Sequence, residues 1–394
     1  MHAATAGLAR LAGLAIGGLA ASALWAGEPK LGQGPAAGIE TAGFNDAAHH
    51  WRGIKEPERV MQMEPDQPSY SATQVREIAA NILLFQRANG GWPKDYDMLA
   101  ILTAAQKKAL RDSHDRSDTT FDNHTTHTQV DYLARAFSQL GDAAYRAAAE
   151  RGFDFMLAAQ YPSGGFPQKW PAPKGIGARI TFNDGVMIGI LTVLRAAAEG
   201  APHFSWLDPN RRERARVAVE MGTASLLRCQ MRVDGRLTAW GQQHDEKTFA
   251  TTAARTFELA CHSPADTTEI VEFLMGVAKP SAEIVTAVDA AVAWLRRVRL
   301  EGIRVERIAA PPAEFIRHNT SYDVVVVPDP AAPVLWARMY EVGSDRPIFA
   351  SRDGIKVYSL AEVDRERRTG SGWYGGYARR LLSHDYPAWR AMQR

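Results

Sequence analysis

Four stretches of the sequence combine acidic, amide, aromatic and glycine residues at unusual density. They are residues 89–98 (NGGWPKDYDM), 121–128 (FDNHTTHT), 180–187 (ITFNDGVM) and 239–258 (AWGQQHDEKTFATTAARTFE). Two further stretches, 346–356 (RPIFASRDGIK) and 370–377 (GSGWYGGY), follow toward the C-terminus. A core excludes most charge, and a solvated helix face seldom carries so many aromatic rings. We therefore interpret these segments as parts of a chemical site.

Two of these stretches place a carboxylate beside a carboxamide just before a predicted helix, as Asp122-Asn123 and Asn183-Asp184. Taken singly, each pair fits a helix N-cap, where Asp and Asn accept from free backbone N–H groups. Taken together, Asp122, Asp184 and Asn183 offer the hard oxygen ligands that Ca²⁺ prefers. The sequence has no EF-hand loop, so such a calcium site would be assembled from distant segments.

Cationic side chains also lie in or beside these stretches. The guanidinium group of arginine is a planar fork that binds carboxylates through two hydrogen bonds, which suits acidic sugars. Trp92 and Trp240 would supply flat faces for sugar rings. The alternative is that the aromatic rings fill the core and the cations form surface ion pairs. The candidate cations are Lys94, Lys247, Arg255, Arg338 and Arg352.

Histidine and cysteine give weaker signals. His124 and His127 have a His-x-x-His spacing, but no HExxH motif accompanies them, so zinc is disfavoured. His244 fits a hydrogen-bonded structural cluster equally well. Two cysteines, Cys229 and Cys261, do not make a disulfide scaffold, and both a single pair and buried free thiols remain open.

Charge and length limit the class of protein. The 394 residues include 46 Lys plus Arg and 44 Asp plus Glu, a net charge of +2. This balance gives no overall field for nucleic acid or a membrane surface, so an acidic partner must be held by locally placed cations. Nucleic acid is therefore not an expected partner.

The N-terminal residues predict export. Arg10 precedes the apolar stretch Leu11–Leu24, and small residues follow, so residues 1–26 fit a signal peptide. The stretch is shorter than the roughly 20 residues of a membrane span, although an uncleaved anchor is the alternative. We expect a secreted or periplasmic protein with an N-terminal arm over residues 27–65 and one catalytic domain over residues 66–394.

Helical periodicity dominates the rest of the chain. A weak internal repeat relates residues 86–94, 160–168 and 230–236, each beginning with Gln at a predicted helix end and continuing into a Gly-containing turn. Repeated helical hairpins favour a mainly α fold, an irregular α/α barrel or toroid with few short strands; three coincidental helix ends are the alternative. Helices are predicted over 75–86, 103–112, 125–140, 142–159, 185–198, 211–229 and 281–298, and strands over 321–327 and near 346–358.

The motif series resembles the family 10 polysaccharide lyases that act as pectate lyases. The quoted stretches, together with residues 269–277 and 357–382, occur in family order over roughly residues 70–385. The resemblance implies an α/α barrel with a wide groove, which binds polygalacturonate or pectin oligosaccharides. It also implies Ca²⁺-assisted β-elimination at α-1,4 linkages, which leaves 4,5-unsaturated products. We expect a monomer.

The resemblance also implies roles for individual residues. Asp122 and Asp184 match the acidic residues of the calcium and substrate site, and Arg255 matches the catalytic base. Arg338 and Arg352 match the ligands of the substrate carboxylate, with Lys94 and Lys247 as further substrate-binding candidates. The sequence departs from the family at Phe166 and at Thr251-Thr252, where Trp and a Pro-Arg pair are usual, and these changes bear on subsite preference.

The implied base has an ordinary pKa above 12. We expect nearby cations and desolvation to lower the pKa of Arg255, and an alkaline activity optimum to follow. Two other functions remain open at this point. One is a glycoside hydrolase that uses Asp122 and Asp184 as acid and base; the other is a non-catalytic uronate-binding protein.

Overall fold

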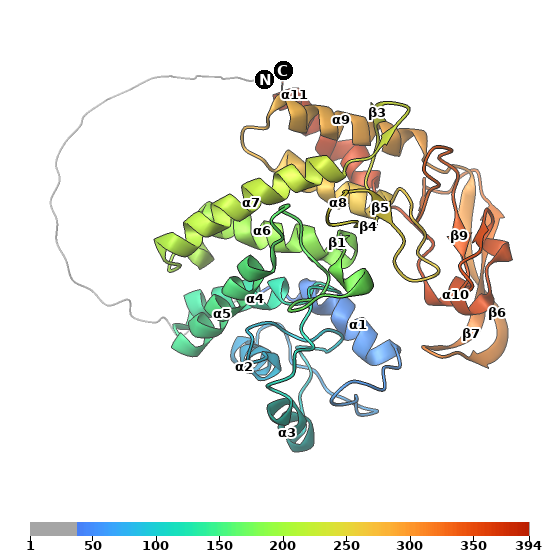
Figure 1. Cartoon of the computed structure of the whole chain (residues 1–394). Coiled ribbons are helices and arrows are strands. Elements are labelled where there is room, and N and C mark those ends of the chain that lie inside the picture. The colour runs from blue at the N-terminus through green and yellow to red at the C-terminus, as the bar shows by residue number, and fades with distance from the viewer. Residues whose placement is uncertain (1–37, 394) are drawn as a thin grey trace, which may run out of the picture. The chain divides into compact units, whose positions relative to one another are not determined.

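A computed structural model describes residues 38–393 of the chain (Figure 1). The described residues are mainly helical, as the periodicity predicts, and form one compact unit. The predicted signal peptide lies outside the described residues. The helices are α1 (Asn45–Gly53), α2 (Val75–Phe85), α3 (Ala104–Asp112), α4 (His127–Leu140), α5 (Ala143–Ala159), α6 (Val186–Ala198), α7 (Pro209–Cys229), α8 (Pro264–Met275), α9 (Ala282–Arg297), α10 (Arg365–Gly370) and α11 (Tyr386–Met392).

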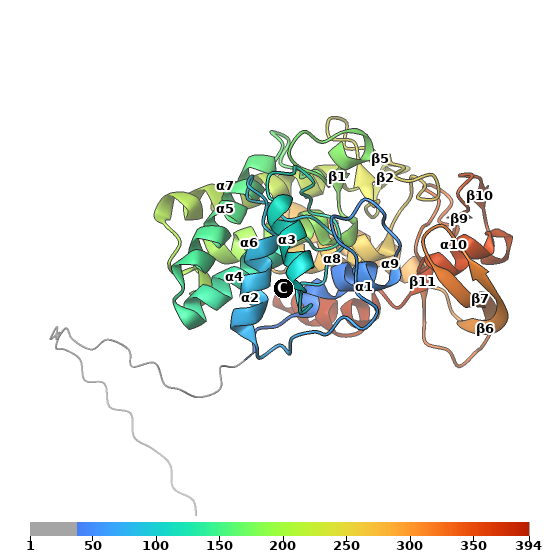
Figure 2. The same ribbon diagram turned by 90° about the horizontal axis from the view of Figure 1, so that it is seen from below.

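The larger helices pack as successive hairpins. Helices α4 and α5, α6 and α7, and α8 and α9 each lie against one another, and α2, α4, α6 and α8 contact their neighbours in that order. The two views in Figures 1 and 2 show these hairpins side by side around the body of the molecule. The predicted irregular α/α toroid is confirmed. No helix among residues 38–393 has the length and apolarity of a membrane span.

Local sequence explains where most of these helices begin. Thr103 forms a capping box with Gln106 at the start of α3, and Ser281 accepts from the Ile284 N–H at the start of α9. Asp142 caps α5 in the same way, through the Ala144 N–H. These helices begin and end within one or two residues of their predicted bounds.

The internal repeat has a structural basis in three glutamines at helix ends. Gln86 donates through Nε2 to the Gly90 carbonyl at 2.9 Å and to Ala148 of α5 at 2.9 Å. Gln160 donates to Gly164 at 3.0 Å and to α7 at 2.8 Å, and Gln230 donates to Thr238 at 3.1 Å and to α9 at 2.9 Å. Each glutamine therefore fixes its own turn and ties it to the next hairpin.

Two tryptophans of the repeated turns belong to the core. Trp92 and Trp240 are 0% exposed, and their indole Nε1 groups donate at 2.8 Å to the carbonyls of Ile82 and Leu226 near the ends of α2 and α7. The prediction that these rings stack on sugars is therefore wrong. They satisfy helix-end carbonyls that would otherwise be buried without a partner.

Strands are short except for one hairpin. The strands β1 (Ile180–Thr181), β4 (Gln243–His244) and β5 (Thr251–Thr252) form an antiparallel sheet in the order β1-β4-β5. The long strands β6 (Ile303–Glu314) and β7 (Asn319–Pro328) pair antiparallel and lie with α10 beside the helical body in Figure 1. The remaining pairs are β2 (Arg232–Val233) with β3 (Arg236–Leu237), β8 (Trp336–Ala337) with β11 (Tyr374–Gly375), and β9 (Phe349–Ala350) with β10 (Lys356–Val357).

Both cysteines are buried free thiols. Cys229 ends α7, and Cys261 lies just before α8. Burial raises the pKa of Cys229 to about 12 and raises the pKa of Cys261 further. Of the two alternatives, the structure therefore has unpaired, unreactive thiols.

Candidate active site

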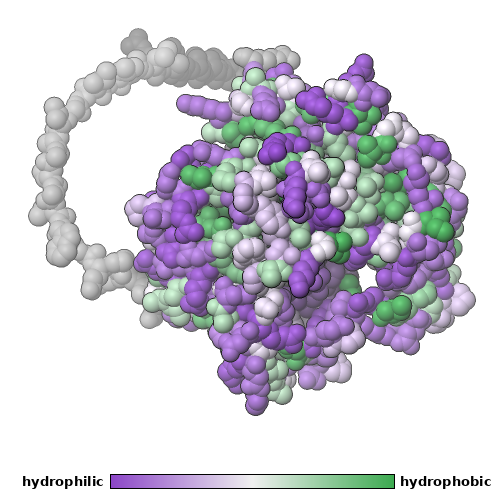
Figure 3. Space-filling view, viewed as in Figure 1, coloured by the Kyte–Doolittle hydropathy of each residue, from purple (hydrophilic) through white to green (hydrophobic). Residues whose placement is uncertain are grey.

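One face of the molecule is hollowed. Figure 3 shows this hollow between the helical body and the part of the chain that carries β6, β7 and α10, with mostly hydrophilic residues around it. Asp122 and Asp184 come from the loops before α4 and α6, and Arg255 follows β5. Arg338 follows β8, and Arg352 lies between β9 and β10.

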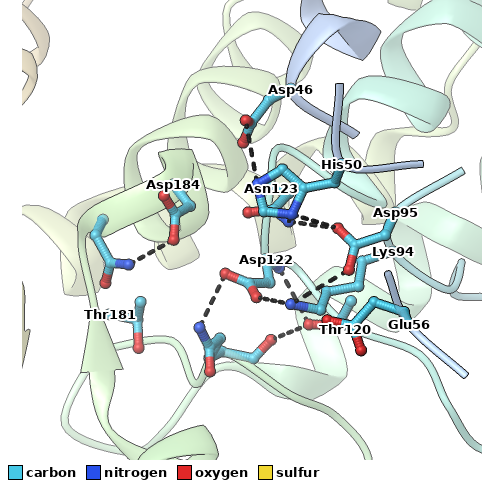
Figure 4. Close-up of polar contacts among 12 residues, drawn as sticks. Asp46, His50, Glu56, Lys94, Asp95, Thr120, Asp122, Asn123, Thr181 and Asp184 are labelled. Carbon is cyan, nitrogen blue, oxygen red and sulfur yellow. Dashed lines mark hydrogen bonds and ion pairs between the residues drawn. The ribbon is translucent and has the colours of Figure 1, made fainter. Parts of the chain in front are cut away.

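Asp122 is a buried carboxylate with two donors. Its Oδ2 accepts from the Lys94 ammonium at 2.7 Å, and its Oδ1 accepts from Gln168 Nε2 at 2.9 Å (Figure 4). Burial alone would raise the pKa of Asp122, but the Lys94 ammonium lowers it below its ordinary value. Asp122 is therefore ionised, and Lys94 lies directly beside it.

Asp184 has the opposite electrostatic character. Burial and the negative charge of Asp122 raise the pKa of Asp184 to about 7. Its Oδ2 accepts from Asn183 Nδ2 at 2.6 Å, and no ion pair joins it to a cation among residues 38–393. The Asn183 Oδ1 atom is buried and has no hydrogen-bond partner there. Within residues 38–393, the Asp184 carboxylate thus lacks an ion-paired cation, and the Asn183 Oδ1 lacks a donor.

Neither carboxylate serves as a helix cap. The N-cap residue of α4 is Thr126 and that of α6 is Gly185, and neither helix has a side-chain capping bond. Asp184 instead adopts a left-handed backbone conformation with φ of 57°. The interpretation of these pairs as N-caps is therefore wrong, and their side chains are directed to the site instead.

A second layer, which the sequence did not reveal, supports the Asp122 loop. Asn123 Nδ2 donates to Asp95 Oδ1 at 2.5 Å, and His50 of α1 lies 3.3 Å from the same oxygen (Figure 4). Burial opposes ionisation, but His50 and Lys94 lower the pKa of Asp95 to about 2. Because residues 27–65 show no clear periodicity, the sequence placed His50 in an arm and not beside the site.

Glu258 joins two of the predicted arginines. Its carboxylate is 4% exposed and accepts from Arg255 Nε at 2.7 Å and Nη2 at 2.6 Å. Arg338 Nη2 donates to the same carboxylate at 2.9 Å. The side chain of Arg255 is 54% exposed, so one buried anion fixes a guanidinium that faces solvent. Glu258 was not among the predicted site residues, although it ends one of the quoted stretches.

The charge state of Arg255 differs from the sequence-based expectation. Burial lowers the pKa of Arg255, but the hydrogen-bonded Glu258 carboxylate raises it, and the net pKa lies above the ordinary value. Asp184 and Asp122 act in the same direction. The expectation of a lowered pKa is therefore wrong for the free protein, because a paired anion outweighs desolvation.

Arg352 and Arg367 share one carboxylate and, together with Arg255, lie around one aromatic ring. Arg352 donates to Glu366 at 2.8 Å, and Arg367 donates to the other oxygen of Glu366 at 2.8 Å. The guanidinium carbons of Arg255, Arg352 and Arg367 lie 4.9, 5.5 and 4.5 Å from the centre of the Phe257 ring. The negative face of the ring makes this close grouping of cations less unfavourable.

The carboxylate pair and the arginine cluster act on each other electrostatically. The charge of Arg338 lowers the pKa of Asp184, and the charges of Asp184 and Asp122 raise that of Arg255. Such mutual effects require proximity. Lys247 differs, because its exposed ammonium has no ion pair within the described part of the chain, and its backbone N–H donates to Asp245. Its predicted role in substrate binding has no support from these contacts.

Two histidines of the quoted stretches, His127 and His244, are buried. His244 Nε2 accepts from the Gly241 N–H at 3.0 Å, and its Nδ1 lies 2.8 Å from the Phe249 carbonyl, so His244 is a structural residue. Burial lowers the pKa of His127 to about 3 and that of His244 to about 4. Within residues 38–393, no three His, Cys, Asp or Glu side chains are grouped as a metal site.

The chain is similar to one known family and to solved structures of related enzymes. A family model described as pectic acid lyase matches residues 86–382. A family 10 polysaccharide lyase from Cellvibrio cellulosa is 30% identical, with a TM-score of 0.66 over 80% of this chain and 95% of that chain. A mutant of a family 10 polysaccharide lyase from the same organism, solved with trigalacturonic acid, is 29% identical with the same TM-score and covers 80% of this chain and 96% of its own. A search of curated proteins gives no match.

The pKa of Asp184 leads to a prediction about stability. We expect Asp184→Asn to raise the melting temperature of the metal-free protein at pH 8 but not at pH 4. The folded pKa of about 7 lies above the ordinary value of 3.8, so this group stabilises the fold below pH 3.8 and loses that contribution as pH rises through 7. Thermal unfolding in EDTA at both pH values measures this. Asp115→Asn, at an exposed position, is the control; equal shifts at both pH values would contradict the prediction.

Proposed function

Because the chain belongs to the pectic acid lyase family, we propose that it cleaves polygalacturonate by β-elimination with Arg255 as the base. The observation that carries this proposal is the shared contact of Glu258 with Arg255 and Arg338. It holds a candidate base and a candidate carboxylate ligand side by side, in the electrostatic field of Asp122 and Asp184. Arg255 and Arg338 are thus joined through one buried carboxylate.

The reaction requires positive charge beside the substrate carboxylate. In β-elimination the C5–H bond and the bond from C4 to the glycosidic oxygen break, and a C4–C5 double bond forms. Negative charge develops on the uronate carboxylate beside C5 as the proton leaves. Arg338 and Arg352 supply donors for that carboxylate, and fixed cations stabilise charge best where it develops. The leaving oxygen receives a proton, so no water is consumed.

Arg255 must be neutral when it accepts the C5 proton. Because Glu258 raises the pKa of Arg255, the neutral form is a minor species at neutral pH. The rate should therefore increase with pH through the alkaline range, since each pH unit raises the neutral fraction about tenfold while the pH lies below that pKa. We therefore still propose an alkaline optimum. The reason is that high pH is needed to deprotonate Arg255, and not that the pKa of Arg255 is lowered.

We further propose that Ca²⁺ binds between the two acidic loops. Asp122, Asp184 and Asn183 present hard oxygen atoms. The Asn183 Oδ1 has no donor and Asp184 has no ion-paired cation among residues 38–393, so a bound cation would satisfy both. Bound there, Ca²⁺ would neutralise charge on the substrate carboxylate. These three side chains provide fewer than the six to eight oxygen ligands that calcium takes, so substrate and water oxygens would complete the set.

An absorbance assay tests the proposed reaction and its calcium requirement. Polygalacturonate incubated with the protein should give a rising ultraviolet absorbance from the 4,5-unsaturated ends. EDTA should abolish the rise, and added Ca²⁺ should restore it. A hydrolase would produce new reducing ends without that absorbance, and a binding protein would produce neither. Cleavage that persists in EDTA would contradict the calcium proposal while leaving the lyase reaction intact.

The location and assembly of the protein remain proposals as well. We propose that residues 1–26 are a signal peptide and that the enzyme acts outside the cytoplasm, either secreted or periplasmic, as a monomer. Polygalacturonate is too large to cross the cytoplasmic membrane freely, so an enzyme acting on the polymer must meet it outside the cytoplasm. Mass measurement of the purified exported protein would locate the cleavage site, and sedimentation would give the assembly state.

A further inference from the structure

The lining of a second depression contains none of the carboxylates and arginines of the candidate active site. Its volume is about 350 Å³, near the lower limit of the range of small-molecule sites. It forms where the first repeated turn meets α5. Its lining includes Asn89, Arg151, Asp154, Trp170 and Pro171.

The depression combines an aromatic ring with an unmatched cation. Trp170 is only partly buried, and its indole Nε1 makes no hydrogen bond within residues 38–393, in contrast to Trp92 and Trp240. Arg151 is exposed and donates through Nη2 to the neutral Gln86 Oε1 at 2.5 Å, but it has no carboxylate partner in the described chain. A half-open ring and a free guanidinium charge are the groups that would bind a uronate sugar.

The acidic residue in the depression is already neutralised. Asp154 accepts from Arg211 Nη2 at 2.7 Å and lies 3.3 Å from Arg214 Nη1. Its charge therefore does not repel an anionic ligand as a free carboxylate would. The remaining net charge of the lining is that of Arg151.

The backbone connects this depression directly to Asp122. Lys169 pairs antiparallel with Thr120, and the Thr119 hydroxyl donates to the Trp170 carbonyl at 2.5 Å. Gln168, two residues before Trp170, donates to Asp122. Two residues of extended chain span about 7 Å, so a polymer held at Asp122 needs only a few more sugar units to reach Trp170.

We propose that Trp170 and Arg151 form an outer subsite that binds a galacturonate unit of the polymer at a distance from the point of cleavage. One sugar ring stacks on the Trp170 indole, and its carboxylate pairs with Arg151. The proposal rests on the proposed function for the identity of the polymer. Its effect is on long substrates, because a short oligosaccharide held at the central site does not extend to the outer subsite.

Kinetics on long and short substrates test this subsite. In the double variant Trp170→Ala/Arg151→Gln, KM for polygalacturonate should rise on the order of tenfold, which corresponds to about 1.4 kcal/mol of binding. The kinetics on trigalacturonate should not change. Trp170→Tyr and Arg151→Lys keep the ring and the charge, and each should retain most of the affinity. Arg76→Gln, an exposed arginine at the other end of α2, is the matched control and should behave as the wild type.

A binding measurement separates this proposal from the proposed reaction. In an Arg255→Ala background, electrophoresis through a gel containing polygalacturonate should retard the protein, and the double variant should be retarded less. A gel containing neutral galactan should retard neither. Equal retardation of both proteins, or an equal loss of activity on trigalacturonate and polymer, would overturn the outer subsite. Failure of the lyase assay alone would not, because the gel reports binding without turnover.

Discussion

Arg255→Ala is expected to lower kcat/KM on polygalacturonate by about 10²–10⁴-fold, the range that a positioned general base contributes. The guanidinium is more than half exposed and is oriented by a buried carboxylate, so its removal takes away the proposed proton acceptor and leaves the core unchanged. The fall should occur in kcat, because substrate binding relies on Arg338, Arg352 and the acidic loops. Initial rates of the increase in ultraviolet absorbance, over a range of substrate concentrations, give kcat and KM separately.

Two controls make this result specific. Thermal unfolding should show that Arg255→Ala folds, since the residue contributes a solvent-facing side chain. Lys247→Ala removes an exposed cation from the loop before Arg255 and should leave kcat essentially unchanged. A variant at Arg255 that retains wild-type kcat, or loses only affinity, would exclude it as the base.

Glu258→Gln is expected to lower kcat/KM by about 10²-fold, the cost of a misplacement near 1 Å in a catalytic group. The carboxylate is nearly fully buried and holds Arg255 through two hydrogen bonds and Arg338 through a third. A neutral amide accepts at only one oxygen, so Arg255 loses one of its two hydrogen bonds and both arginines lose the negative charge that anchors them. Because Arg255 is the proposed base and Arg338 a proposed carboxylate ligand, kcat should fall and KM should rise together.

Glu366→Gln provides the matched comparison. Glu366 anchors Arg352 and Arg367 in the way that Glu258 anchors Arg255 and Arg338, but it does not touch Arg255. Its substitution should therefore raise KM with little change in kcat. If Glu258→Gln and Glu366→Gln changed kcat and KM in the same way, Glu258 would not position Arg255 specifically and would only support the loop.

The helical part of the fold could be predicted because periodicity is local. Helices α3, α5 and α9 show both an apolar face and a capping residue in sequence, and their bounds were predicted closely. Helix α8 was missed, because its first half carries Asp266, Thr267 and Thr268, which are buried by tertiary packing. Strand β6 was not predicted because it contains two prolines, which are rare inside strands. The hairpin accommodates them at the register shift between Ala309 and Ala313.

The candidate site could be predicted only in part. Residue type and motif order identified Asp122, Asp184, Asn183 and the three arginines. The sequence could not distinguish the buried Trp92 from the open Trp170, because burial depends on which helix end the indole reaches. The sign of the pKa shift of Arg255 depends on its pairing with Glu258. Both residues lie in the same motif, but the sequence does not show that they form an ion pair.

The most direct test is a crystal structure of Arg255→Ala with Ca²⁺ and trigalacturonate. The account predicts one uronate carboxylate between Arg338 and a cation held by Asp122 and Asp184, with the C5 hydrogen of that sugar directed at the position vacated by Arg255. A cation bound away from these two carboxylates, or a sugar whose C5 hydrogen faces another residue, would contradict it.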